Sequence, residues 1–307
     1  MRLTKSKFAM ALTCPTKLFY IANDEYANQS VEDSFLAALA DGGFQVGELA
    51  KQYFPEGINI KTLDVIKSLE KTKELLKKEN VIIFEAAVKH KNCVIRVDVL
   101  EKKGSHIKIH EVKAKSFNGT QGTNFLKKDG TPNSIWKKYL YDVAFQKWVC
   151  SKALDNHMIS AHLMLADKSK KIAVAGLNQK FRVIEVNGRK EVKVEDGIQK
   201  EHLSPEILTS INVDNICAGI FASTDHGLGV EETFGQMIQR FSFACEHKQI
   251  IQSQLGTHCG KCEFVCSDND KVIKKRDGRL ECFKRILGIG PAVFDKPTIF
   301  DLWNFRG

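Results

Sequence analysis

Three consecutive β-rich runs constrain the fold of this chain more than any other feature. They are VIIFEAAV (81–88), CVIRVDVL (93–100) and HIKIHEVKA (106–114), and the links between them are the short, turn-forming segments KHKN and KKGS. Links of this length join strands that run in opposite directions. The sequence therefore predicts three neighbouring antiparallel strands.

Segments with helical spacing of apolar residues surround these strands. Val31 to Phe54 predicts one helix, or two in tandem because Gly42 and Gly43 interrupt it, and Lys61 to Lys78 predicts a solvated amphipathic helix. Ser116 to Ser134 is rich in glycine and polar residues and predicts a mobile loop, and a further helix is expected from about Ile135 to Leu154.

The rest of the chain adds β runs and a cysteine-rich tail. HMISAHLMLAD, KKIAVAG and FRVIEVN, between 157 and 187, indicate that the sheet continues or that a small subdomain is added. A long amphipathic helix is expected over Glu231 to Gln254. The expected fold class is α/β or α+β around one central mixed sheet flanked by helices, with a core over 1–254 and a cysteine-bearing segment over 255–307.

Three charged residues of the β-rich runs form a candidate catalytic group. Glu111 and Lys113 are two apart and project from one sheet face, and a hairpin can bring Asp98 beside them. The two carboxylates can bind a hard divalent cation, Mg²⁺ or Mn²⁺, with the Val112 carbonyl and Glu85 completing the oxygen shell. The ion would polarise a phosphodiester and activate water, while Lys113 orients that water or neutralises developing charge.

A structural explanation of the same residues stays open. Asp98 and Lys113 can form a cross-strand ion pair with Glu111 merely solvated, because E-x-K arises by chance in a lysine-rich chain. The helix that follows, however, carries Tyr139, Asp142 and Gln146 at spacings of three and four among apolar neighbours. A role confined to the surface is therefore less expected for this group.

The succession FEAAV, RVDVL, EVKAKS and YLYDVAFQ resembles the core of the PD-(D/E)XK nucleases of the RecB-like kind. The resemblance spans about residues 1–150 and 255–300, and it implies the restriction-endonuclease-like fold with Asp98, Glu111 and Lys113 as the catalytic set. It also implies that Gln146 contacts the active site or DNA. Many members carry a metal-binding histidine on the first core helix, where this chain offers only Gln45 and Glu48. Either Glu48 substitutes as an acidic ligand or the metal site is weaker than in those members.

The tail sequence HCGKCEFVC…ECF contains Cys259, Cys262, Cys266 and Cys282. A C-x-x-C pair places two thiolates on one metal, and two further ligands would close a structural site.

Cys14, followed by Pro15, resembles the opening of CRISPR-associated iron–sulfur nucleases and AddB-type helicase nucleases, in which one early cysteine and three late ones hold a 4Fe–4S cluster. The resemblance implies Cys14, Cys259, Cys262 and Cys282 as ligands, with Cys266 competing for the last place. Zinc accepts the same four thiolates and stays the alternative metal. Either metal would tie the two ends of the chain together.

Composition bears on the partner and the compartment. The formal net charge of +9 suits a polyanion, and no apolar stretch has the length of a signal peptide or a membrane helix, so a cytoplasmic protein is expected. H-E-x-x-H, G-x-S-x-G and P-loop patterns are absent, which disfavours zinc proteases, serine hydrolases and P-loop NTPases. Residues expected near nucleic acid are the lysines and aromatics around the loop: Lys115, Lys127, Lys128, Tyr139, Phe117, Phe125 and Trp136.

The sequence thus predicts a metal-dependent DNA nuclease acting on single strands or DNA ends. It would work in defence, repair or recombination, with protein partners from such a system. The alternative is a non-catalytic nucleic-acid-binding protein that keeps the nuclease fold and an iron–sulfur or zinc site.

Overall fold

The computed structural model describes residues 1–31, 34–172, 175–186, 189–195, 198, 203–290 and 292. The chain forms two compact units, one of residues 1–36 with 223–307 and one of residues 37–222. The first unit therefore combines both ends of the chain, and the second contains the sheet. The boundaries 1–254 and 255–307 stay a prediction.

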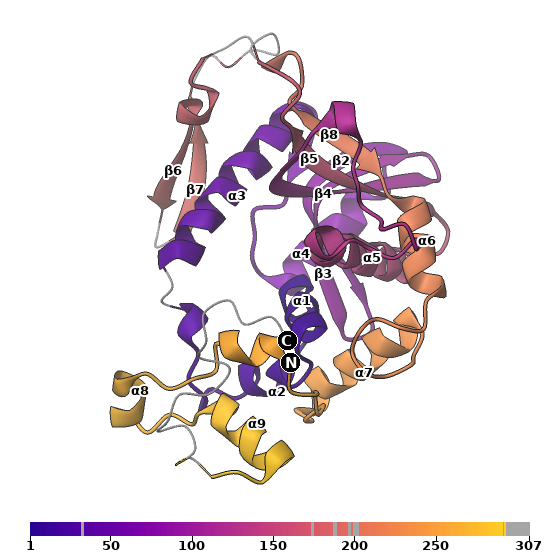
Figure 1. Ribbon diagram of the computed structural model, residues 1–307. Coiled ribbons are helices and arrows are strands. Elements are labelled where there is room, and N and C mark those ends of the chain that lie inside the picture. The colour runs from indigo at the N-terminus through magenta and orange to yellow at the C-terminus, as the bar shows by residue number, and fades with distance from the viewer. Residues whose placement is uncertain are drawn as a thin grey trace. The chain divides into compact units, whose positions relative to one another are not determined.

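The second unit is built on a six-stranded mixed sheet in the order β1-β2-β3-β4-β5-β8 (Figure 1). The pairs β2–β3, β3–β4 and β5–β8 are antiparallel, whereas β1–β2 and β4–β5 are parallel. The strands span Ile58–Asn59 (β1), Asn80–His90 (β2), Cys93–Lys103 (β3), His106–Phe117 (β4), Met158–Asp167 (β5) and Leu208–Asn212 (β8). The predicted antiparallel run 81–114 is confirmed.

Helices cover both faces of this sheet. They span Ser34–Gln52 (α3), Val65–Leu75 (α4), Ser134–Ala153 (α5) and Asp214–Ala222 (α6), with short 3₁₀ turns at Gly119–Gln121 (η2) and Leu177–Lys180 (η3). The predicted helix at the start of the core is a single one, because α3 passes without a break through Gly42 and Gly43. Parallel pairing of β4 with β5 requires a crossover, and the segment that contains α5 supplies it.

Strand register decides which helix meets which face. Val112 pairs with Met164, and both pack in the core that includes Leu49 and Ala50 of α3. Their neighbours Glu111 and Leu163 pair on the opposite face. The α5 helix packs on that second face, since Gln146 bonds Glu111 there.

The ladder between β3 and β4 ends before either strand does. The last pair is Val99 with His110, although β3 begins at Cys93 and β4 runs on to Phe117. Before Val99, β3 pairs only with β2, and after His110, β4 pairs only with β5. The two strands therefore separate and leave a fork that opens beside Asp98 and Glu111.

One expectation for the middle of the chain differs from the structure, and for another the structure agrees with the second of its two alternatives, a small added sheet. KKIAVAG forms no strand in its described residues, 170–172 and 175–176, and residues 173 and 174 lie outside the described part. FRVIEV does form a strand, Phe181–Val186 (β6), but it pairs with Arg189–Val194 (β7) in a separate two-stranded sheet. Alternation of apolar residues predicts a strand, not the sheet that it joins.

The first unit contains α1 (Lys5–Thr13), α2 (Lys17–Ile21), α7 (Phe234–His247), α8 (Asp268–Val272) and α9 (Gly278–Leu287), with 3₁₀ turns at Gln29–Val31 (η1) and Thr257–Lys261 (η5). The helix expected over 231–254 is shorter than predicted. It ends at His247 because Lys248 takes a left-handed conformation (φ 51°) and caps it. Phe8 of α1 packs against Phe234 and Phe241 of α7, with ring centroids 5.9 and 6.1 Å apart.

Backbone hydrogen bonds join the early chain to the late chain within this unit. Ala27 N donates to Arg276 O (3.0 Å), Arg276 N donates to Glu25 O (2.8 Å) and Gln29 N donates to Glu263 O (2.8 Å). The side chain of Arg276 also forms ion pairs with Glu25 (2.9 Å) and Glu281 (2.6 Å). Segments that are more than two hundred residues apart in sequence thus form one local structure.

Within the described residues, no helix is long and apolar enough to cross a membrane.

Asp214, the first residue of α6, connects three elements of the sheet unit. Its carboxylate accepts hydrogen bonds from Lys147 Nζ (2.6 Å), Ala161 N (2.8 Å) and Ser160 Oγ (2.7 Å). Burial tends to raise the pKa of this carboxyl, but these bonds outweigh it and lower the value to about 2. The ionised form is thus favoured in the folded protein.

We expect Asp214→Asn to lower the free energy of unfolding by about 1 to 2 kcal/mol at pH 7, because charge-assisted bonds to a partly exposed group are lost. Since the folded pKa is depressed, this stabilisation is present above pH 4 and is lost as the pH falls toward 2. Urea unfolding at pH 7, 4 and 3 measures it. The exposed Asp155→Asn is the control, and a difference from wild type that did not shrink with falling pH would contradict the expectation.

Candidate active site and cysteine cluster

Asp98 and Glu111 lie where β3 and β4 separate, one residue beyond the pair Val99 and His110. Continuation of this register places them opposite each other, on one face. Asp98 Oδ2 accepts a hydrogen bond from Val112 N at 2.8 Å, so a carboxylate replaces the strand partner that the backbone loses at the fork. The predicted convergence of Asp98 with the 111–113 segment is what the structure shows.

The Val112 carbonyl faces the same gap. In a strand the N–H and C=O of one residue point to the same side, and the Val112 N–H points to Asp98. The carbonyl oxygen therefore points to the side of the strand where Asp98 lies.

Glu111 is almost completely buried, with 1% of its side chain exposed. Its Oε2 accepts a bond from Gln146 Nε2 of α5 at 2.6 Å, and its Oε1 is bound by Lys113 Nζ. A carboxylate is costly to bury unless such donors surround it. The helix α5 therefore holds Glu111 in place, and Gln146 lies at the site as expected.

Asp142 joins the group, which agrees with the expectation that the polar residues of this helix are not confined to the surface, although no specific role was predicted for it. Its Oδ2 lies 2.9 Å from Lys113 Nζ, and its Oδ1 accepts a weaker bond from Gln146 Nε2 at 3.3 Å. The spacing of four between Asp142 and Gln146 was the available signal, but only the packing of α5 on β4 shows that both reach the same lysine and glutamate.

The donor set at the fork suits a hard cation. Lys113 contacts two carboxylates, Glu111 and Asp142, so these three side chains carry an excess negative charge even before Asp98 is counted. In addition, Gln146 Oε1 is buried without a hydrogen-bond partner among the described residues. Buried carboxylates and an unused acceptor are complementary to an ion with its bound water.

The two further expected metal ligands, Glu85 and Glu48, have different surroundings. Glu85 of β2 lies between Phe84 and Ala86, which pair with Val99 and Val97, so its backbone is opposite Asp98. Its φ of 58° is unusual for a non-glycine residue, and such backbone strain often accompanies functional sites. Glu48, by contrast, bonds Lys51 (3.1 Å) and Gln52 (3.4 Å) on its own helix.

The expected nucleic-acid residues separate into buried and accessible ones. Phe117, Phe125 and Trp136 are 8%, 3% and 7% exposed and therefore belong to the core, which corrects the expectation that they stack on bases. Lys127 and Lys128 are exposed on the turn closed by the Leu126–Pro132 bridge. Tyr139 and Lys115 are partly exposed and contact each other.

The four expected cysteine ligands all lie in the first unit, and Cys14 acts electrostatically on the other three. Burial tends to raise the pKa of Cys259, and the nearby Cys14 acts in the same direction, but a hydrogen bond with His258 leaves the value lowered. Burial raises the pKa of Cys282, and the nearby Cys14 and Cys259 raise it further. Burial also raises the pKa of Cys262 to about 11, with a further contribution from Cys14. Each late cysteine therefore lies within electrostatic reach of Cys14.

His258 interacts with two of these thiols. Cys14 and Cys259 raise its pKa to about 10. Burial alone raises the pKa of Cys14, but bonds with His258, Ser253 and Thr16 outweigh it and lower the value to about 7. A thiol of this kind is readily available as the thiolate that metals bind.

Cys266 has other neighbours. Its thiol donates to Lys275 O at 3.3 Å, and its backbone N donates to Asp277 Oδ2 at 2.9 Å. Burial raises the pKa of this thiol, and the negative charges of Asp277 and Asp270 raise it further. Cys282, in contrast, lies 3.0 Å from the hydroxyl of Tyr20, in the cluster with Phe264 and Cys262.

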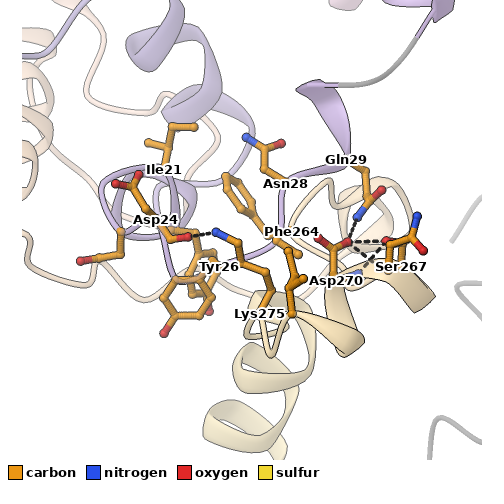
Figure 2. A pocket seen from close by; sticks show the side chains of 14 residues that line it. Ile21, Asp24, Tyr26, Asn28, Gln29, Phe264, Ser267, Asp270 and Lys275 are labelled. Atoms are coloured by element: carbon orange, nitrogen blue, oxygen red, sulfur yellow. Dashed lines mark hydrogen bonds between the residues drawn. The ribbon is translucent and has the colours of Figure 1, made fainter.

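A pocket of about 440 Å³ also lies in this unit, between residues 20–29 and 264–275 (Figure 2). Asp270 Oδ2 accepts bonds from Gln29 Nε2 and Ser267 Oγ, both at 2.6 Å, and Lys275 donates to the backbone oxygen of Asp24. Its polar groups thus bond one another, and its lining residues include no cysteine. The pocket therefore lies along the contact between the early and the late part of the chain.

Across the described ranges, no three His, Cys, Asp or Glu side chains converge in the way that would grip a metal. At the fork, Lys113 and Gln146 engage Glu111, and Val112 N engages Asp98. A cation that binds at the fork would have to replace contacts of this kind with its own bonds to Glu111 and Asp98.

Comparison of the chain with protein-family models, with curated proteins and with solved structures finds no match. A function for this chain is therefore argued from the geometry of the fork and from the chemistry of its side chains.

Proposed function

We propose that this chain is a divalent-metal-dependent DNA nuclease of the PD-(D/E)XK type, acting on single strands or ends. The observation that supports it best is the fork between β3 and β4. There Asp98 bonds the backbone of Val112, while Glu111 and Lys113 meet on the same sheet face under Gln146 and Asp142. Two carboxylates and a lysine in this relation suit phosphodiester hydrolysis.

The residues at the fork have separable tasks. Asp98 and Glu111 would hold Mg²⁺ or Mn²⁺, with the Val112 carbonyl and Glu85 as further oxygen donors. When bound, such an ion supplies Lewis acidity to the phosphate and lowers the pKa of a coordinated water. Gln146 fixes the carboxylate of Glu111, and its own buried Oε1 can accept a hydrogen bond from a water molecule.

Lys113 is one step further along β4, with 25% of its side chain exposed. An ammonium group here can neutralise charge that develops on the phosphate, because its position is held by Asp142. The net charge of +9 favours approach of a polyanion to the protein as a whole.

The four cysteines are proposed as ligands of a 4Fe–4S cluster, with zinc as the alternative. The support is that Cys14 acts electrostatically on each of the three late cysteines and that its own pKa is lowered to about 7. A metal held by Cys14 and the late cysteines would reinforce the backbone bonds that already join residues 25–29 to 263–276.

Incubation with end-labelled single-stranded and duplex DNA tests the nuclease proposal. We expect the wild type to cut with Mn²⁺ or Mg²⁺ and to stop when EDTA is added, and the product lengths would distinguish exonuclease from endonuclease action. If the wild type binds DNA but cuts neither substrate with either ion, the chain is a non-catalytic nucleic-acid-binding protein.

A further inference from the structure

The side of β4 that carries the site meets α5 in three successive contacts. Glu111 Oε2 lies 2.6 Å from Gln146 Nε2, Lys113 Nζ lies 2.9 Å from Asp142 Oδ2, and Lys115 Nζ lies 5.5 Å from the ring centre of Tyr139. Each step advances two residues on the strand and three or four on the helix, as their geometries require. The third contact is thus the direct continuation of the candidate active site.

Beyond Glu111, the side chains of this series are more exposed. Glu111 is 1% exposed and Lys113 is 25% exposed, and both partners of the third contact, Lys115 and Tyr139, are partly exposed. The series therefore leads from the buried carboxylate to the protein surface. A strand whose phosphate reached Lys113 would pass Lys115 and Tyr139 next.

The third contact combines an aromatic ring with two ammonium groups. Lys115 Nζ lies 4.9 Å from the ring centre of Trp136 as well as 5.5 Å from that of Tyr139, and Lys138 Nζ lies 4.8 Å from that of Tyr139. Trp136 is covered by Phe125, at a ring distance of 5.0 Å. Tyr139 is left as the accessible ring of this group.

This combination suits an unpaired nucleotide. Base stacking on an aromatic ring is tolerant of sequence, and lysines beside the ring can bind the flanking phosphates. In a duplex the faces of each base are covered by its neighbours, so a ring of this kind discriminates in favour of single strands.

We propose that Lys115, Lys138 and Tyr139 form a subsite for one unpaired nucleotide beside the reacting phosphate, which makes the chain selective for single-stranded DNA. The inference rests on the proposed nuclease function for its location. The stacking itself can be measured without any cleavage.

The test measures affinity by fluorescence anisotropy, in EDTA, for a labelled oligo-dT and for a labelled hairpin duplex. We expect Tyr139→Ala to weaken binding of oligo-dT roughly tenfold and to leave duplex binding within about twofold. Tyr139→Phe should bind like wild type because the ring is kept. Phe243→Ala, which removes an exposed aromatic ring elsewhere (53% exposed), is the matched control and should change nothing.

Salt dependence examines the two lysines separately. Lys115→Ala and Lys138→Ala should each reduce the slope of log affinity against log salt by about one half to one. If Tyr139→Ala proves unstable in a thermal melt, Tyr139→Leu keeps the bulk and removes the stacking face, and the same tenfold loss is expected.

Distinct outcomes separate this subsite from the nuclease function. Equal affinity of Tyr139→Leu and wild type for oligo-dT would overturn the subsite, even if the wild type cleaves DNA. A wild type that never cleaves but loses oligo-dT affinity with Tyr139→Leu would support the subsite and end the nuclease proposal.

Discussion

Asp98→Asn should reduce DNA cleavage by about a hundred- to a thousandfold, a cost typical of removing one electrostatic contact from a reacting centre. The substitution keeps a side-chain oxygen that can accept the bond from Val112 N, now 2.8 Å from Asp98 Oδ2. It removes the negative charge that a divalent ion needs. Fold stability should therefore change by less than about 0.5 kcal/mol.

Three measurements on the same preparation check this prediction. Initial cleavage rates on single-stranded DNA give the effect, Mn²⁺ titration gives the ion affinity, and urea unfolding confirms the fold. Asp155→Asn, an exposed carboxylate after α5, is the matched control. If Asp98→Asn cleaves DNA at the wild-type rate, the Asp98 carboxylate serves only to accept the hydrogen bond from Val112 N.

Lys113→Ala distinguishes the lysine from the carboxylates. The variant frees Glu111 and Asp142 from the ammonium group that now contacts both, so the ion should bind as well as in wild type or better. Cleavage should still fall by a hundredfold or more because the charge near the phosphate is lost. Improved ion affinity together with unchanged cleavage would exclude Lys113 from the chemistry.

Cys14→Ser should have the largest effect on the structure of the first unit. Cys14 is the proposed ligand from the early part of the chain. Its charge acts to raise the pKa of Cys259, Cys262 and Cys282. Loss of one ligand opens the site, and the binding energy of a structural metal contributes directly to folding. We expect the melting temperature to fall by more than about 5 °C.

Anaerobic purification gives the readout. The wild type should be brown, with broad visible absorption and about four iron atoms per chain expected of a 4Fe–4S cluster, and Cys14→Ser should be colourless with a lowered melting temperature. Cys266→Ser is the matched control, because its thiol bonds Lys275 O instead of joining the group, and it should keep both colour and stability. A colourless wild type that contains zinc would replace iron–sulfur with zinc, and equal behaviour of the two variants would refute the ligand set.

Local sequence was sufficient for the elements that carry the site. The three β-rich runs with short links predicted β2, β3 and β4 and their antiparallel order, because alternation and turn length act over neighbouring residues. Glu111 and Lys113 had to share a face because side chains in a strand alternate. The C-x-x-C spacing likewise keeps Cys259 and Cys262 close together, because only two residues separate them along the chain.

Contacts between distant segments decided the remainder. The fork after Val99 and His110, the meeting of Asp142 with Lys113, and the contact of Cys282 with Tyr20 all depend on how separate elements pack together. Burial also selected Tyr139 over Phe125 and Trp136 as the accessible ring. The sequence by itself determined which groups could take part, since that depends on residue type and local period. The tertiary structure decided which of them meet, because register, packing and exposure depend on the whole unit.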